Sequence, residues 1–270
     1  MTSTDGEHFG SFKTADIDRQ DAARLAFVLD AIAAKPAVQT LKAWALAALA
    51  PKPGEFALDV GSGTGEDTVA LYAITGRAVG VEPSPGLRAE AAQRAGQGEV
   101  EYVEGDATDL PYDDATFDVI RCERVLQHVG EPARAVAEMA RVLKPGGRIA
   151  LIDTDWQTAI MHPADPDVIG RISAHLMSQS ANPFAGRQLR GLLVDAGLTI
   201  EGETAATWIE PQEGANEGFL QAMIPTSVAA GAITAEEAEA FQTAMTEAAA
   251  RGAFHFSLTM YGVTGTKPSR

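Results

Sequence analysis

The densest group of residues suited to chemistry lies where an apolar run meets a glycine-rich turn, in Leu58-Asp59-Val60-Gly61-Ser62-Gly63-Thr64-Gly65. Side chains at the three glycines would hold a ligand away from the backbone, and glycine permits the positive φ that a tight turn often needs. The amides exposed there and at the start of the following helix suit a polar or anionic group. The spacing G-x-G-x-G lacks the last step of the G-x-G-x-x-G dinucleotide fingerprint, which argues against a nicotinamide cofactor.

The elements that must position this turn alternate between strands and helices. We expect strands at 56–60, 78–82, 100–104, 117–121 and 148–153, and helices at 64–75, 85–95 and 132–143. The strands are apolar without alternation, as expected when both faces of a sheet are buried. This order predicts a parallel sheet with helices on both faces, in which ligands bind beyond the carboxyl ends of the strands.

Less regular segments flank the alternating region. A loose arm at 1–15 precedes helices expected at 18–34 and 38–49. The alternation breaks at 155–183, an apolar segment among prolines and histidines that we interpret as a cap inserted after the fifth strand. A helix at 186–196 and a strand at 198–210 follow. Residues 213–251 are expected to be helical, with a capping box from Thr234 to Glu237, before a final strand at 253–264.

Composition narrows the class of protein. The 270 residues, 46% of them apolar, suit one large α/β domain, and the net charge of −16 disfavours nucleic acid as a partner. The sequence has no run of 18 uncharged apolar residues, so it does not predict a membrane span. It also has no basic N-terminal region followed by an apolar one, so it does not predict secretion. The single cysteine, Cys122, excludes an intrachain disulfide and a multi-cysteine metal site. We therefore expect a cytoplasmic protein.

Several further blocks accompany the glycine turn in a fixed order. They are Val79-Gly80-Val81-Glu82, Glu104-Gly105-Asp106-Ala107, Phe117-Asp118-Val119-Ile120, Val125-Leu126-Gln127-His128 and Leu143-Lys144-Pro145-Gly146-Gly147. Together they resemble the motifs of class I S-adenosylmethionine-dependent methyltransferases. The chain is similar to the small-molecule members of the ubiquinone and menaquinone biosynthesis type.

The resemblance implies a Rossmann-like, seven-stranded, mostly parallel sheet with helices on both faces. N-terminal helices and a cap would lie over the carboxyl ends of the strands. Residues 1–54 would form the N-terminal arm and helices, as part of a lid. Residues 55–270 would form the methyltransferase domain, with cap insertions at about 155–185 and 213–251.

The resemblance also implies which residues contact S-adenosylmethionine. These are Asp59, Gly61, Ser62, Gly63, Gly65, Glu82, Pro83, Asp106, Ala107 and Arg121. A carboxylate accepts two hydrogen bonds, so Glu82 can hold both ribose hydroxyls. Asp106 and the amide of Ala107 would meet the adenine, although Gly105-Asp106 is also ordinary turn chemistry.

Candidates for the chemical step lie after the fourth and fifth strands. His128 could act as a general base, since its unperturbed pKa is about 6.5; alternatively it packs under its helix and bonds a carbonyl. Asp155 and His162 are placed to meet the substrate in the expected cap, where Asp155 could pair with an ammonium group. We expect no bound metal.

The predicted reaction is in-line transfer of a methyl group to an oxygen, nitrogen or carbon of a small molecule, leaving S-adenosylhomocysteine. The substrate is expected to be partly apolar or cationic. Two alternatives stay open, a non-methylating enzyme that binds the same cofactor and a cofactor-binding regulatory protein. An NAD-dependent oxidoreductase is disfavoured by the glycine spacing and by the turn at Lys144–Gly147.

Overall fold

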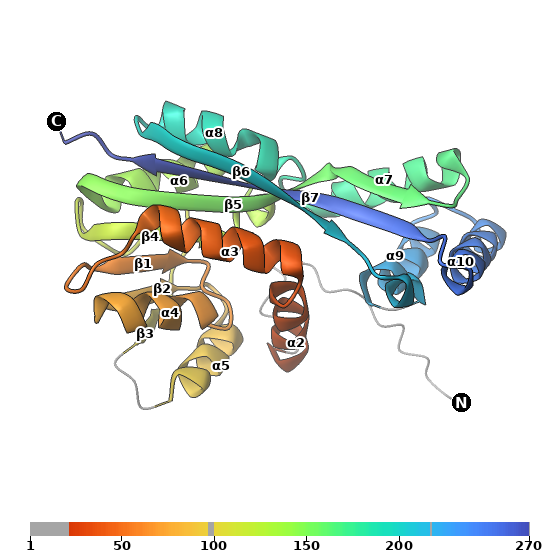
Figure 1. Ribbon diagram of the computed structural model, residues 1–270, viewed down its shortest axis with the longest axis horizontal. Coiled ribbons are helices and arrows are strands. Elements are labelled where there is room, and N and C mark those ends of the chain that lie inside the picture. The colour runs from red at the N-terminus through yellow and green to blue at the C-terminus, as the bar shows by residue number, and fades with distance from the viewer. Residues whose placement is uncertain (1–21, 97–99, 217, 270) are drawn as a thin grey trace.

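A seven-stranded sheet in the order β3-β2-β1-β4-β5-β7-β6 runs through the molecule (Figure 1). The computed structural model describes residues 22–96, 100–216 and 218–269, so the expected arm at 1–15 and the start of the helix expected from residue 18 lie outside it. The strands are β1 (Ala57–Val60), β2 (Ala78–Val81), β3 (Glu101–Val103), β4 (Phe117–Glu123), β5 (Leu143–His162), β6 (Thr199–Ile209) and β7 (His255–Thr266). The first five are parallel and β7 is antiparallel to both neighbours, which confirms the expected mostly parallel sheet.

Helices cover both faces of this sheet, as expected. They are α2 (Ala22–Ala33), α3 (Pro36–Leu49), α4 (Glu66–Thr75), α5 (Pro85–Ala95), α6 (Pro132–Val142), α7 (Pro166–Gln179), α8 (Ala185–Asp195), α9 (Gly218–Ala229) and α10 (Ala235–Ala250). One buried cluster joins α3 and α4 to the sheet, with Leu41 and Leu71 as members, and a second joins α6 and α8 through Met139 and Leu189. Within the described residues, no helix has both the length and the apolar character that crossing a membrane requires.

Strand β5 is much longer than the expected strand at 148–153. It pairs with β7 from Arg148 opposite Thr266 to His162 opposite His255, with one irregularity between Asp155 and Ile160. At that irregularity the Thr158 hydroxyl accepts a hydrogen bond from the amide of Thr259 (2.9 Å) and donates one to the carbonyl of Asp155 (2.7 Å). The first part of the expected cap, 155–162, is therefore a continuation of the sheet, because β7 supplies a partner strand for its backbone groups.

The outer halves of β5, β6 and β7 extend past the other strands and carry α7, α9 and α10 (Figure 1). A short helical turn, η2 (Gln212–Asn216), connects β6 to α9. The predicted capping box is confirmed, since Thr234 accepts from the amide of Glu237 (3.1 Å) and Glu237 accepts from the amide of Thr234 (2.8 Å). The buried cluster under α3 also includes side chains of α9 and α10, namely Met223, Phe241 and Met245.

The core beneath α6 yields a stability prediction. Phe117 is fully buried, with Phe56 and Tyr112 rings 4.6 and 4.8 Å from its centroid. Because Phe117→Ala leaves a cavity there, we expect the free energy of unfolding to fall by about 3–5 kcal/mol. Denaturant unfolding measures this. The control Val194→Ala, at a side chain that is 52% exposed, should stay within about 0.5 kcal/mol. Equal effects of the two variants would contradict the packing described.

Candidate functional site

One cavity of 1710 Å³ opens at the carboxyl ends of β1, β2 and β4. Its inner half is lined by the glycine turn, Glu82 and residues of α2. Its outer half continues along the extended parts of β5, β6 and β7 beneath α7 and α9, where Trp156, Leu176, Met223 and Phe256 line it. Ligand pockets are usually about 300–1,000 Å³, so this cavity has room for two ligands side by side.

The glycine turn forms one wall of the inner half. Gly61, Gly63 and Gly65 all have positive φ, at 70°, 53° and 82°. A Cβ on Gly61 would lie 2.2 Å from Val125 Cγ2, and one on Gly65 would lie 2.3 Å from the Tyr102 hydroxyl. These two positions therefore need glycine because protein atoms approach them. Gly61 and Gly63 line the cavity and Gly65 does not, so the structure places Gly65 behind the predicted site.

Glu82 joins the end of β2 to the glycine turn. Its Oε2 accepts a hydrogen bond from the amide of Gly63 (3.0 Å), and its Oε1 accepts one from the amide of Ser84 (3.0 Å). The residue is 4% exposed and lines the cavity. The two amides hold the carboxylate in one orientation, so a negative charge is fixed at the cavity wall.

The other inner residues divide into two groups. Ser62, Pro83 and Ala107 line the cavity, and the buried Ser62 hydroxyl has no hydrogen-bond partner among the described residues. Asp59 and Asp106 also line it, but each has an internal role. Asp59 accepts from the hydroxyl of Thr68 (2.7 Å), and burial, followed by the charge of Asp67, raises the pKa of Asp59 to about 7. The Asp106 carboxylate accepts from the amide and the hydroxyl of Thr108 (2.8 and 2.7 Å), as a turn residue does.

Three charged residues lie at the end of β4 or directly after it. The buried Arg121 guanidinium bonds Asp67 (3.1 Å) and Glu123, and Arg121 does not line the cavity. Glu123 and Arg124 do line it. Arg124 has a φ of 55°, which is rare for a residue with a side chain, and its Nε lies 3.3 Å from Glu123 Oε1. Sequence reasoning selected Arg121 and missed Arg124, although both belong to the charged run that follows the apolar part of β4.

His128, expected on the helix after the fourth strand, lies in a single helical turn, η1 (Leu126–His128). Asp153, at the end of the parallel part of β5, holds this turn by accepting from the amide of Gln127 (3.2 Å), and burial raises the pKa of Asp153 to about 7. His128 lines the same cavity as the glycine turn and Glu82. Burial, aided by the charge of Arg124, lowers the pKa of His128 to about 3. The imidazole is therefore neutral at physiological pH and weakly basic.

Neither Asp155 nor His162 lines the cavity. Asp155 is buried, and its carboxylate is held by Nε and Nη2 of Arg187 on α8, the latter at 2.7 Å. From the sequence we expected that Asp155 could pair with an ammonium group of the substrate. In the structure its carboxylate is instead paired with Arg187 of the same chain. His162 is exposed at the far end of β5, because that strand runs on to residue 162 instead of leading into a cap.

Helices α2 and α3 contribute cavity residues that sequence reasoning did not select. Phe27, Val28 and Leu29 of α2 line the inner half, beside the glycine turn. The ammonium group of Lys42, on α3, bonds Glu66 (2.6 Å) and Asp67 (2.9 Å) of α4. A lone lysine within the apolar run of the second expected helix was a visible signal for a polar contact. The role of α2 was not visible, because it depends on packing against α5.

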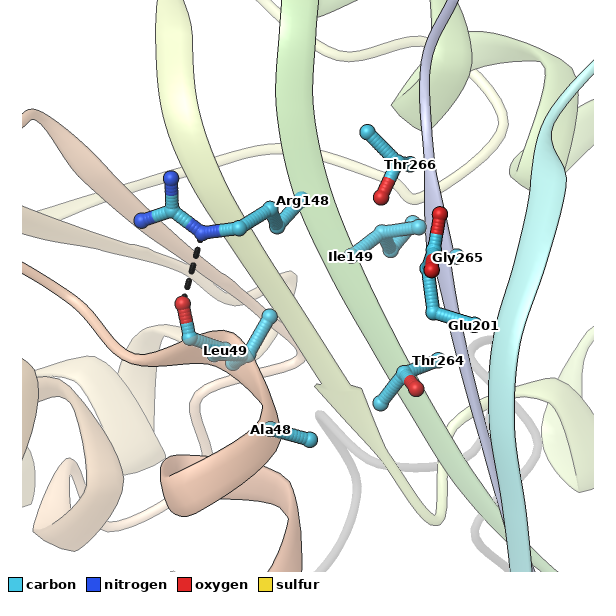
Figure 2. A pocket seen from close by; sticks show the side chains of 8 residues that line it. All are labelled: Ala48, Leu49, Arg148, Ile149, Glu201, Thr264, Gly265 and Thr266. Carbon is cyan, nitrogen blue, oxygen red and sulfur yellow. Dashed lines mark hydrogen bonds between the residues drawn. The ribbon is translucent and has the colours of Figure 1, made fainter.

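A smaller pocket of 290 Å³ lies away from this site, toward the amino end of the parallel part of β5 (Figure 2). Arg148 points toward the end of α3 and donates to the carbonyl of Leu49 (2.6 Å) and to Glu55 (2.6 Å). None of the predicted site residues lines this pocket. The predicted site residues that line a cavity therefore all lie in the large one.

Comparison with known proteins agrees with this placement. A family model described as a methyltransferase domain matches residues 58–151, from the glycine turn into β5. An uncharacterized 37.1 kDa transposon protein of Streptomyces fradiae is 37% identical over 177 residues, which are 64% of this chain and 51% of that protein. A demethylmenaquinone methyltransferase of Bacillus cytotoxicus is 32% identical over 168 residues, which are 54% of this chain and 71% of that enzyme.

Solved structures share the fold. A geranyl diphosphate C-methyltransferase from Streptomyces coelicolor has a TM-score of 0.55 at 16% identity, over 98% of this chain and 94% of that one. The chain spans about half the length of several curated relatives that it matches. Residues 58–151 hold the glycine turn and Glu82, and the Bacillus cytotoxicus relative is matched over most of its length. The chain thus belongs to the class I S-adenosylmethionine-dependent methyltransferases.

Proposed function

We propose that this protein transfers a methyl group from S-adenosylmethionine to a small, partly apolar molecule. The observation that carries the proposal is the meeting of the Gly61–Gly63 turn and the Glu82 carboxylate on one wall of the cavity, with an apolar chamber beside them. Both features come from the segment that the methyltransferase family model matches.

The inner half fits S-adenosylmethionine on its own chemistry. The unpartnered, buried hydroxyl of Ser62 and the glycine amides offer polar groups for the methionine end. Glu82 would hold the ribose hydroxyls. Pro83, Leu87 and Ala107 offer an apolar wall for the adenine, with Asp106 at its edge. Gly65 and Arg121 would act from behind, Gly65 by admitting Tyr102 and Arg121 by holding Asp67 and Glu123.

The outer half would hold the acceptor. Its walls are apolar and aromatic, which favours a hydrophobic molecule over a sugar or a peptide. The demethylmenaquinone methyltransferases among the relatives are named for a quinone-type substrate. We propose that α2, with the other described residues before β1, and the segments 163–185 and 213–251 act as the lid and cap that close the cavity. Asp155 and His162 would contribute indirectly, through the placement of α8 and the end of β5.

In this mechanism the protein aligns two reactants and excludes water. When bound, S-adenosylmethionine supplies an electrophilic methyl group on a sulfonium centre. The glycine turn and Glu82 would fix the donor, and the outer chamber would fix the acceptor in line with it. Asp153 holds the η1 turn, so His128 would face the acceptor as a neutral imidazole that orients it by a hydrogen bond.

The proposed function also includes the partners and the cellular location of the protein. The charge of −16 disfavours nucleic acid, and the apolar chamber favours a small molecule. We propose a cytoplasmic location, supported by the buried free thiol of Cys122.

Turnover tests the proposal directly. The protein is incubated with S-adenosylmethionine and a panel of hydrophobic phenols, quinols and aromatic acids, and S-adenosylhomocysteine and methylated product are measured together. We expect equal amounts of both. An acceptor that is converted without gaining a methyl group would support the non-methylating alternative, and tight binding of NAD without S-adenosylhomocysteine binding would contradict the proposal.

The turn itself can be tested with a matched pair of glycines. Gly63→Ala and Gly76→Ala both place a side chain at positive φ, which costs about 1–2 kcal/mol in each case. Gly76 has open space around it, whereas Gly63 lines the cavity. We expect only Gly63→Ala to weaken S-adenosylhomocysteine binding, by at least about tenfold in calorimetry. Equal affinities of the two variants would count against the assignment of the turn.

The state of His128 can be read by NMR. Because its pKa is lowered to about 3, its ring carbon shifts should stay at the neutral values from pH 8 down to pH 5. The signal is assigned by its loss in His128→Gln. A His128 transition between pH 6 and 7 would restore it as a candidate general base.

A further inference from the structure

The cation Arg124 is not used by the mechanism above, although it lines the cavity. It follows β4 directly and precedes Val125, whose side chain packs on Gly61 of the glycine turn. Its charge contributes to the low pKa of His128, so the guanidinium lies near that ring. Arg124 therefore lies where an acceptor would meet the methyl donor.

The hydrogen-bonding capacity of Arg124 is largely unused. Within the described part of the chain its guanidinium donates no hydrogen bond, and its one ion pair is the 3.3 Å contact of Nε with Glu123. Glu123 is shared with Arg121, which takes the other carboxylate oxygen, so it neutralises Arg124 only in part. Only 15% of the Arg124 side chain is exposed. Its Nε is buried without a hydrogen-bond acceptor, which is costly for a charged group.

The other cations along the cavity are already engaged. Lys35 is held by Glu210 (2.9 Å), and Lys42 is held by Glu66 and Asp67. Arg24 also has an interaction of its own. Arg124 is the cavity-lining cation, among the described residues, whose donors remain for a ligand.

The backbone at Arg124 is held in an unfavourable conformation. A φ of 55° costs about 1–2 kcal/mol for a residue with a Cβ. The amide of Arg124 is fixed by the carbonyl of Ile152 (2.8 Å), and its carbonyl accepts from the Gln127 side chain (3.4 Å). Such strain gathers at functional sites, where it aims a side chain.

We propose that Arg124 is a specificity-determining residue that binds an acidic oxygen of the acceptor, a carboxylate, phenolate or enolate, while the apolar outer half takes the rest of the molecule. This inference rests on the proposed function and names its substrate class. A guanidinium presents paired donors that match two oxygen lone pairs, and the contact gains strength in a cavity that excludes water. Trp156, Phe256 and Met260 supply the apolar side of the same acceptor.

The test uses two probes of equal shape, 2-naphthoate and 2-naphthamide, titrated calorimetrically into the protein at pH 7 with and without saturating S-adenosylhomocysteine. We expect the wild-type protein to bind the acid at least about tenfold more tightly than the amide. Arg124→Gln should bind both equally, and Arg124→Lys should fall between. The control Arg190→Gln, which removes an exposed arginine paired with Glu203 outside the cavity, should keep the wild-type preference.

Several results would overturn the inference. The first is that the wild-type protein binds the acid no better than the amide, or does not bind the acid at all. The second is that the Arg124→Gln variant keeps the wild-type preference for the acid. Loss of S-adenosylhomocysteine binding in a folded Arg124→Gln variant would also overturn it, by placing the guanidinium in the donor site. The wild-type comparison needs no variant, so it decides even if Arg124→Gln does not fold. Failure of the proposed function is distinguishable, because it appears as absent S-adenosylhomocysteine binding by the wild-type protein.

Discussion

The pairing of β5 with β7 along almost its whole length is the constraint on which the site depends. In its inner part this pairing completes the sheet beside β4, and in its outer part it carries β5 and β7, with β6 alongside, beyond the other four strands (Figure 1). One pair of strands thus continues the sheet beside β4 and builds a wall of the apolar chamber. The Thr158 hydroxyl links β5 to β7 at the one irregularity of their pairing, so the inner and outer parts of β5 stay on the same partner strand.

Charge is distributed unevenly between those halves. The ends of β1, β2 and β4 bring Asp59, Glu82, Glu123 and Arg124 to the inner half, whereas the outer half is lined mainly by apolar and aromatic side chains, with the Lys35–Glu210 ion pair among them. Buried carboxylates require compensation, and Glu82 receives it from backbone amides while Asp59 receives it from Thr68. The inner half therefore suits a polar donor with defined hydrogen-bonding groups, and the outer half suits an acceptor recognised by shape.

The inner half could be predicted from sequence because its residues follow strands directly along the chain. Glu82 comes after an apolar run, and Gly61 comes after another, so their place at the sheet edge follows from local pattern. The outer half could not be predicted in the same way. The extension of β5 depends on a partner strand about a hundred residues later, and the occupation of Asp155 depends on Arg187, in a helix that follows. Both are tertiary effects, which local periodicity does not encode. Arg124 was missed for a different reason. Its role is inferred from the hydrogen bonds that its guanidinium lacks in the folded protein, and the sequence alone does not reveal them.

A crystal structure of the protein with S-adenosylhomocysteine tests the central claim most directly. The claim predicts the ribose hydroxyls within hydrogen-bond distance of the Glu82 carboxylate and the amino acid end against Gly61 and Gly63, with the sulfur facing the outer chamber. A ligand seated in the outer half with Glu82 uncontacted, or in the small pocket beside Arg148, would contradict it.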